Sequence, residues 1–398
     1  MDGATTTRLA ELAVGFGANV QPGQIVAVEG ETGMEMIVRA IAERAYERGA
    51  RFVEANYFDP YVKRVRLERA AEETLDFVPP WYGDRMRAYG EHHSARIALV
   101  PRVSPGILEG IDPDRAGRDE LPDLRERLDL INDRTVNWTA VPYPTRAWAS
   151  VVHPQLDEDE SAARLSEELA YVLRLDAPDP IAAWKERAEA LEAAAERLNE
   201  LELDSLRFEG LGTELTIGIL PSSRWDAARA TTRDGIVYCA NLPTEEVFTT
   251  PDPVRAEGVV RSTRPLELGG TVIEGLTVRF EGGSAVAIDA DKGAEVLRRR
   301  ASVDDGASRL GEVALVDREG RIGPLGTVFY NTLLDENAAS HIALGSAYEM
   351  NVDEADLPLI NRSKIHVDFM IGSNDVEVTG VTRDGREMTL LSDGRWQI

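Results

Sequence analysis

The sequence predicts an α/β N-terminal domain with a largely parallel sheet, residues 1–205, followed by a β-rich α+β C-terminal domain, residues 206–398. In the first half, short apolar runs alternate with amphipathic stretches, which is typical of parallel α/β layers. In the second half, short β-type runs are separated by glycine-containing turns. A chain of 398 residues is also long enough for about two or three domains of ordinary size.

Strands and helices alternate in the N-terminal half. Met34–Arg48 has apolar residues at helical spacing, and Gly49 follows where a helix C-cap is expected. The turn Pro22-Gly23 precedes the first expected strand. The predicted strands are Gln24–Gly30, Arg51–Ala55 and Ala95–Val100, and the predicted helices are Met34–Arg48, Tyr61–Leu75 and Ile181–Leu201.

The pattern changes near residue 205. Leu206–Ile219 alternates apolar and polar residues, and the later runs are separated by Gly-Gly and Asp-Gly pairs that favour hairpins. We therefore expect mainly antiparallel strands. They are Gly235–Cys239, Gly258–Thr263, Thr271–Phe280, Ser284–Ala290, Glu312–Val316, Lys364–Ile371 and Val376–Val381, with turns at Gly269-Gly270, Gly282-Gly283, Asp384-Gly385 and Asp393-Gly394.

The charge balance is strongly acidic. With 70 Asp and Glu residues against 44 Lys and Arg residues, the formal net charge is −26, which opposes binding to nucleic acid and to anionic membranes. Only four of the basic residues are lysines. Two explanations stay open: adaptation to a cytoplasm of molar salt (a halophilic protein), or an arginine-rich genome combined with an ordinary acidic surface.

Several classes of protein are excluded by inspection. No apolar run approaches about 18 residues, and the first residues lack the basic and apolar regions of a secretory signal, so we expect a cytoplasmic protein. The single cysteine, Cys239 in an apolar run, excludes an internal disulfide and a CxxC motif. The chain has no phosphate-binding GxxxxGK[ST], no GxGxxG after a strand, no GxSxG and no HExxH motif.

Among the five histidines, His366 lies in a candidate site. In the expected strand Lys364–Ile371, His366 and Asp368 project from one face, since alternate residues share a face. Such a pair can be half of a metal site or a simple ion pair. His92, His93 and His153 have no comparable neighbours along the sequence, and we expect surface or local roles for them.

A second candidate histidine is His341. We expect a helix here, capped by Asp335 or Asn337, and in a helix Tyr348 would lie nearly two turns beyond His341 on the same face. Gly345 between them would leave room for a ligand. A polar site and an ordinary helix face are both compatible with this spacing.

The remaining candidate site residues are carboxylates. Glu245 and Glu246 are adjacent in a proline-bounded segment that we expect to be a loop. Glu312 opens an apolar strand, where a buried carboxylate requires a partner. All these candidates fall in the second predicted domain.

Together these segments resemble the thermophilic metalloprotease family of metalloaminopeptidases, of the aminopeptidase T and aminopeptidase S type. The resemblance extends over nearly the whole chain. Its segments are Leu9–Gly23 (LAELAVGFGANVQPG), Asn241–Pro251 (NLPTEEVFTTP), Gly311–Val316 (GEVALV), Phe329–Gly345 (FYNTLLDENAASHIALG) and His366–Gly372 (HVDFMIG).

The resemblance implies a homodimeric exopeptidase that acts on peptides with two divalent metal ions per chain. The implied ligands are Glu246, Glu312, His341, Tyr348, His366 and Asp368, and Glu245 is the implied general base. Two imidazoles, three carboxylates and a phenol suit zinc, cobalt or manganese. Two such ions about 3.5–4 Å apart can share a water, lower its pKa and polarise the scissile carbonyl.

We therefore expect a cytoplasmic, metal-dependent aminopeptidase. Asp335 and Glu336 are further acids near the implied site, and they can bind the substrate amine, cap a helix or support the ligands. Two alternatives stay open: a metal-dependent dipeptidase or other amide hydrolase, and a homologue that binds metal and peptides without turnover.

Overall fold

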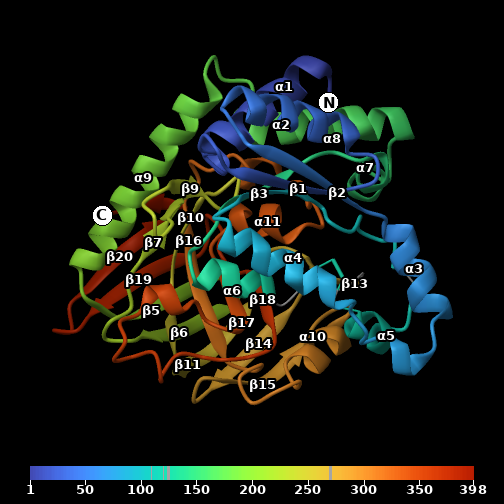
Figure 1. Cartoon of the computed structure of the whole chain (residues 1–398). Helices are drawn as coiled ribbons and strands as arrows, with labels where there is room; N and C mark the ends of the chain where they lie inside the picture. The colour runs from blue at the N-terminus through green and yellow to red at the C-terminus, as the bar shows by residue number, and fades with distance from the viewer. Residues whose placement is uncertain (109, 120, 123–125, 269–270) are drawn as a thin grey trace. The chain divides into compact units, whose positions relative to one another are not determined.

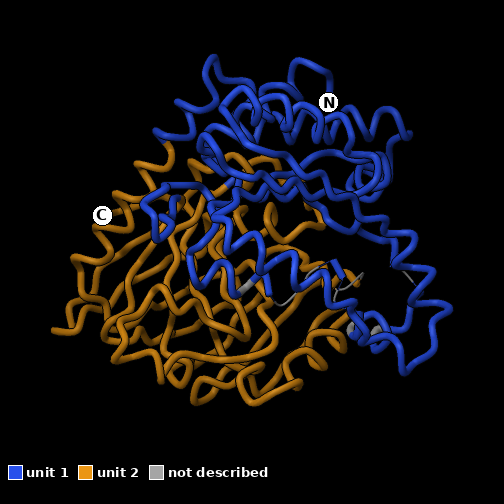
Figure 2. Tube along the Cα trace, viewed as in Figure 1, with its two compact units in different colours: residues 1–186, 229–243 blue, residues 187–228, 244–398 orange. Residues whose placement is uncertain are grey.

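The computed structural model describes residues 1–108, 110–119, 121–122, 126–268 and 271–398, so the expected turn at Gly269-Gly270 lies outside the described residues. The chain forms two compact units, which are coloured separately in Figure 2. Unit 1 comprises residues 1–186 and 229–243, and unit 2 comprises residues 187–228 and 244–398. The units change within helix α9 (Pro180–Glu200), whereas the sequence places the domain boundary at residue 205. That domain boundary stays a prediction.

Unit 1 contains a four-stranded parallel sheet, which confirms the expected α/β fold (Figure 1). The strand order is β2-β1-β3-β4, and every neighbouring pair is parallel. The strands are β1 (Ile25–Glu31), β2 (Phe52–Phe58), β3 (Ala95–Val100) and β4 (Asn137–Pro142). The sequence predicts the first three of these strands. It misses β4, because Trp138 and Pro142 weaken the apolar run there.

Helices lie on both faces of this sheet. On one face, α4 and α6 pack against Ala27 of β1, while α1, α2 and α8 lie on the other side in Figure 1. The predicted helix Tyr61–Leu75 ends early, at Arg69, because Ala70 has an extended backbone. The helices that begin in unit 1 are α1 (Gly3–Leu12), α2 (Glu35–Glu47), α3 (Pro60–Arg69), α4 (Pro80–Glu91), α5 (Pro113–Arg118), α6 (Glu126–Asn132), α7 (Arg146–Val152), α8 (Glu158–Val172) and α9.

A buried ion pair joins two strands of the parallel sheet. Arg96 Nη2 of β3 lies 3.0 Å from both carboxylate oxygens of Glu29 in β1, and Arg102 Nη2 lies 3.1 Å from Glu29 Oε2. Burial by itself raises the pKa of Glu29, but the two guanidinium groups outweigh it and lower that pKa to about 2.

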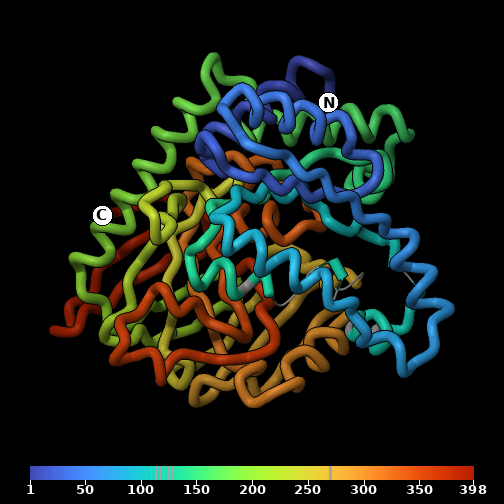
Figure 3. The backbone as a smooth tube through the Cα atoms, viewed as in Figure 1, coloured from blue at the N-terminus to red at the C-terminus, as the bar shows by residue number. Residues whose placement is uncertain are grey.

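Unit 2 is built from antiparallel strands, as the sequence predicts. The eight-stranded sheet has the order β15-β14-β11-β6-β5-β19-β20-β21, and the five-stranded sheet has the order β18-β17-β16-β10-β7. Figure 3 shows that the beginning and the end of unit 2 meet in the larger sheet, where β5 pairs with β19. The larger sheet comprises β5 (Leu203–Gly210), β6 (Thr213–Ile219), β11 (Pro251–Arg261), β14 (Thr277–Glu281), β15 (Ser284–Asp289), β19 (Glu377–Thr382), β20 (Glu387–Ser392) and β21 (Arg395–Trp396).

The five-stranded sheet is apolar on one face. The strands of this sheet are β7 (Asp226–Ala227), β10 (Glu246–Thr249), β16 (Leu310–Val316), β17 (His341–Gly345) and β18 (His366–Met370). Alternate residues of these strands join one hydrophobic core with residues of the larger sheet. The five-stranded sheet contributes Val247, Val313, Leu315, Ile342, Leu344, Val367 and Phe369 to that core. The opposite face of the same strands is therefore free for polar side chains.

Smaller elements complete the described chain. Strands β8 (Arg229–Thr231) and β9 (Val237–Cys239) pair in unit 1. In unit 2, β12 (Leu266–Leu268) pairs with β13 (Thr271–Ile273), and α10 (Ala294–Arg300) follows β15. Among the residues that the structure describes, no helix is both long and apolar enough to cross a membrane.

The expected helix from Asp335 or Asn337 to Tyr348 is wrong. Two short helical turns, α11 (Thr332–Asp335) and η4 (Glu336–Ala338), end before the strand β17 begins at His341. The physical reason is strand pairing, because β17 is hydrogen-bonded to both β16 and β18. The sequence of this segment alone does not reveal such partners. The expected loop around Glu246 is also corrected, since β10 begins at this residue.

Candidate metal centre

The polar face of the five-stranded sheet presents five of the six candidate ligands. Residues directly opposite each other in antiparallel strands share a face. Ala343 of β17 is opposite both Glu312 of β16 and Asp368 of β18, so these two carboxylates flank it. By the alternation of β18 and β17, His366 and His341 project from the same face.

Small residues keep this face open. Ala314 of β16 and Ala343 of β17 lie between the candidate ligands, and neither has a side chain long enough to fill the space. Gly345 was expected to leave room for a ligand, but its backbone gives a stronger reason for glycine. Its φ is +109°, and a Cβ there would lie 2.1 Å from the carbonyl oxygen of Ile365.

One group of potential ligands surrounds His341. The Nε2 atom of His341 lies 3.0 Å from Glu246 Oε2 and 4.0 Å from Glu312 Oε1. One potential ligand atom from each of the three residues lies within 4.8 Å of the other two, which is close enough to hold one metal ion. All three residues are buried.

A second group surrounds His366. Its Nε2 atom lies 3.2 Å from Glu312 Oε2 and 3.3 Å from Asp368 Oδ1. This group also satisfies the distance of 4.8 Å between potential ligand atoms. Glu312 therefore belongs to both groups, with one carboxylate oxygen toward each histidine. A carboxylate in this position can bridge two cations.

Backbone carbonyls fix both imidazole rings. His341 Nδ1 lies 3.1 Å from the carbonyl oxygen of Ala339, and His366 Nδ1 lies 2.8 Å from that of Ser346. A carbonyl oxygen only accepts, so each Nδ1 carries the donated proton. The Nε2 atoms are then directed at the carboxylates, in the tautomer that a metal ligand needs.

The electrostatics reflect a dense cluster of charges. Burial lowers the pKa of His341, but Glu246 and Glu312 outweigh it and raise that pKa to about 10. The pKa of His366 is raised well above its usual value in the same way, by Asp368 and Glu312 against burial. Protons and a metal ion would compete for the same Nε2 atoms, so metal binding at this site would release protons.

Tyr348 lies beside this cluster rather than on the strand face. Its ring centroid is 5.4 Å from that of His366 and 5.7 Å from that of Phe248. Desolvation of the phenol, in a residue that is 40% exposed overall, and the negative charges of Glu312 and Asp368 raise the pKa of this phenol well above the usual value. The helical stripe that was expected to align Tyr348 with His341 does not exist, but the fold still brings the phenol to the cluster.

The neighbouring Glu245 is directed elsewhere. Its Oε2 atom lies 2.5 Å from Arg187 Nε, and its Oε1 atom accepts a 3.4 Å hydrogen bond from the backbone of Arg321. Arg187 also binds Asp317, with its Nη atoms at 2.9 and 3.2 Å from the two carboxylate oxygens. Glu245, Arg187 and Asp317 form a buried network, and no motif in the sequence indicated Arg187.

Asp335 and Glu336 differ from each other. Asp335 accepts backbone hydrogen bonds from Phe329 at 2.8 Å and from Asn331 at 3.0 Å, which is a local structural role. Burial raises its pKa to about 7. Glu336 instead begins the turn η4, which packs against β18. Burial and the charges of Asp368 and Glu246 raise its pKa well above the usual value.

Two of the remaining histidines, His93 and His153, have acidic partners in unit 1. His153 is buried, with Nε2 at 2.9 Å from Glu168 Oε2, a partner that sequence proximity did not show. His93 pairs with Asp234.

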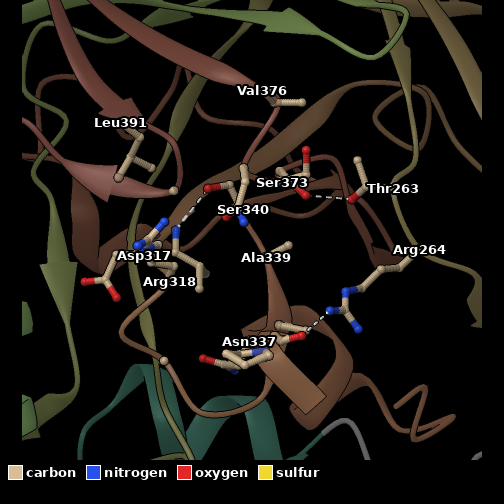
Figure 4. Close-up of a pocket in the computed structure, with 18 of the residues that line it drawn as sticks. Thr263, Arg264, Asp317, Arg318, Asn337, Ala339, Ser340, Ser373, Val376 and Leu391 are labelled. Atoms are coloured by element: carbon tan, nitrogen blue, oxygen red, sulfur yellow. Dashed lines mark hydrogen bonds between the residues drawn. The ribbon is translucent and has the colours of Figure 1, made fainter. Parts of the chain in front are cut away.

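A cavity of about 610 Å³ adjoins the segment that leads into His341 (Figure 4). Asn337, Ala339 and Ser340 of this segment form part of its wall, together with Arg264 and Arg318. Ser340 fixes the strand entry, because its Oγ accepts a 3.0 Å hydrogen bond from the backbone of Val316.

The fold and this site indicate a class of protein: one whose β-sheet presents two histidine–carboxylate groups that share Glu312 and could hold metal ions. A family model described as thermophilic metalloprotease (M29) matches residues 3–396. The chain belongs to this family of metalloproteases.

Relatives of known name agree with the assignment to this family. Aminopeptidase T from Thermus aquaticus and that from Thermus thermophilus are each 42% identical over 400 residues, covering 98% of both chains. Aminopeptidase 2 from Geobacillus stearothermophilus is 37% identical over 401 residues, 98% of this chain and 97% of the relative. The solved structure titled wild-type AmpT from Thermus thermophilus matches with a TM-score of 0.93 at 42% identity, covering 99% of both chains.

Proposed function

We propose that this protein is a metal-dependent aminopeptidase that removes N-terminal residues from peptides with two divalent ions per chain. The observation that supports two ions best is the position of Glu312, with Oε1 toward His341 and Oε2 toward His366. The names of the relatives support an aminopeptidase in particular.

The donor set fits such ions. Both imidazoles direct Nε2 into the cluster, and Glu246, Glu312 and Asp368 supply anionic oxygens next to them. Tyr348 is the sixth proposed ligand, on the evidence of its ring beside His366. This mixture of nitrogen and oxygen donors suits Zn²⁺, Co²⁺ or Mn²⁺. Two bound ions would polarise the scissile carbonyl and lower the pKa of a shared water.

The chain itself must supply a group that moves a proton from the attacking water to the leaving amine. The sequence predicts Glu245 for this role. Glu336 is a second candidate, because it lies near the cluster without being one of the six proposed ligands. The surroundings of these two glutamates differ, because Arg187 holds the Glu245 carboxylate.

The experiment combines metal removal with a panel of substrates. Chelated protein should hydrolyse an aminoacyl-p-nitroanilide only after Co²⁺, Zn²⁺ or Mn²⁺ is restored, and an N-acetylated analogue should stay intact. Cleavage of the acetylated analogue would contradict an aminopeptidase. Hydrolysis of dipeptides alone would indicate a dipeptidase, and two bound ions without any hydrolysis would indicate a binding protein.

A homodimer in the cytoplasm is the assembly and location that we propose with this activity. Light scattering of the purified protein measures the assembly directly. A mass of one chain, against the 43.7 kDa calculated for the monomer, would contradict the dimer.

A further inference from the structure

Two glutamates are candidates for the residue that transfers the proton in peptide hydrolysis. This inference rests on the proposed function. Glu245 and Glu336 both lie close to the candidate ligands, one beside Glu246 in sequence and the other on the turn η4. A proton carrier needs a carboxylate oxygen that faces the reacting atoms and is not already occupied by a strong donor.

Glu245 does not meet this requirement. It is fully buried, and its Oε2 atom is held at 2.5 Å by the guanidinium of Arg187 in a charge-assisted contact. Its Oε1 atom accepts from the backbone of Arg321. Because successive residues of an extended chain point in opposite directions, Glu246 faces His341 while Glu245 faces Arg187.

Glu245 has a positioning role instead. Its backbone N–H donates to Asn337 Oδ1 at 2.6 Å, and its side chain is tied through Arg187 to Asp317. Asp317 directly follows Val316, which is the register partner of Glu246. The network therefore fixes the start of β10, where Glu246 must point into the cluster.

Glu336 is not held by a donor of this strength, and its turn lies against the strand of two candidate ligands. The turn η4 packs against β18, the strand of His366 and Asp368. Within the described residues, the Glu336 carboxylate accepts a long hydrogen bond, 3.5 Å, from Asn337 Nδ2. The same Asn337 is anchored by its bonds to Glu245 and to the carbonyl oxygen of Leu333, so the residue next to Glu336 is held in place.

We propose that Glu336, rather than Glu245, is the carboxylate that transfers the proton during peptide hydrolysis. Glu336 takes one proton from water as the water oxygen bonds to the carbonyl carbon. The same proton then passes to the peptide nitrogen as the C–N bond breaks. One water is consumed, the products are an amino acid and a shortened peptide, and Glu336 returns to its ionised form.

The test is Glu336→Gln in the full-length chain, with Glu319→Gln as the matched control because Glu319 is exposed in the same unit. Metal-free protein is titrated with Co²⁺ by calorimetry, and the visible absorption of bound Co²⁺ reports the ligand set. We expect Glu336→Gln to bind two Co²⁺ with an unchanged spectrum while kcat falls by about 10²–10⁴. Glu319→Gln should match the wild type in all three measurements.

Other outcomes overturn the inference. A kcat within threefold of the wild type excludes Glu336 as the proton carrier, and loss of Co²⁺ or a changed spectrum makes it a ligand. Should Glu336→Gln fail to fold, Glu336→Asp keeps the carboxylate but shortens its reach. We expect Glu336→Asp to retain the Co²⁺ spectrum while kcat is reduced and the pH dependence of kcat is altered. A wild-type pH dependence of kcat would contradict proton transfer by Glu336.

Glu245→Gln separates the two glutamates. We expect it to lower Co²⁺ affinity and thermal stability, because it loosens the segment that positions Glu246. If Glu245→Gln keeps both ions and loses kcat by the factor expected for Glu336→Gln, the roles are reversed. A wild-type protein without metal-dependent hydrolysis would instead refute the proposed function itself.

Discussion

Glu246 and His341 meet at 3.0 Å although a complete strand lies between their own strands. Glu246 begins β10, His341 begins β17, and both strands pair with β16. The β16 residue opposite His341 is Ala314, whose methyl group is too small to separate the two side chains. The contact therefore depends on a small residue in the middle strand as much as on the two groups that touch.

The shared position of Glu312 predicts the stoichiometry of metal loss. Removing a residue of one group, as in His341→Ala or Asp368→Ala, should lower the content from about two ions per chain toward one and abolish activity. Glu312→Ala should lose both ions, because this carboxylate faces both histidines. Elemental analysis after dialysis measures the content, with the exposed His92→Ala as control. Equal losses in all three site variants would contradict the bridging role.

The network around Arg187 predicts a large effect on stability. Arg187→Gln leaves the carboxylates of Glu245 and Asp317 buried without their cation, which costs about 3–5 kcal/mol of unfolding free energy. Urea denaturation measures this loss. Arg197→Gln on the same helix is the control, since Arg197 is exposed, and it should change stability by less than about 0.5 kcal/mol. Equal effects of the two substitutions would show that the network of Arg187 does not contribute to the free energy of unfolding.

The ion pair of Glu29 predicts a pH-dependent contribution in unit 1. Its pKa falls from 4.5 to about 2 on folding, so its stabilisation is complete above pH 4.5 and is lost as the pH falls toward 2. Glu29→Gln should therefore destabilise by roughly 3 kcal/mol at pH 7 and by about 1 kcal/mol less at pH 3.5. Denaturant unfolding at the two pH values tests this, with the exposed Glu73→Gln as control. A destabilisation that is the same at both pH values would contradict the lowered pKa of Glu29.

The net charge of −26 predicts a dependence on salt. At an ionic strength of 0.01 M the Debye length is about 30 Å, so the acidic groups repel one another across the molecule. If the composition is an adaptation to high salt, the melting temperature and the activity should rise toward molar KCl. A melting temperature that is flat between about 0.1 and 2 M KCl would favour the explanation by an arginine-rich genome.

The sequence alone determined the fold class of the N-terminal and C-terminal halves of the chain, and most of the residues that meet in the candidate metal centre. Alternation within Lys364–Ile371 put His366 and Asp368 on one face, and β18 confirms that face. The demand of a buried carboxylate for a partner singled out Glu312, which lies 3.2 Å from His366. These inferences are local, because period and burial depend on neighbours along the chain.

Only the tertiary structure decided what depends on pairing between distant strands. The segment at His341 is rich in alanine and contains glycine, so its own preference does not distinguish a helix from a strand, and its ladders with β16 and β18 made it a strand. Likewise, Glu245 and Glu246 are chemically identical and adjacent. Arg187 lies 58 residues away from Glu245 in sequence but contacts its carboxylate in the fold. Glu245 is therefore held in a buried network, while the carboxylate of Glu246 faces His341. The sequence supplies the chemical groups, and their separation in space follows from long-range packing that a local pattern does not contain.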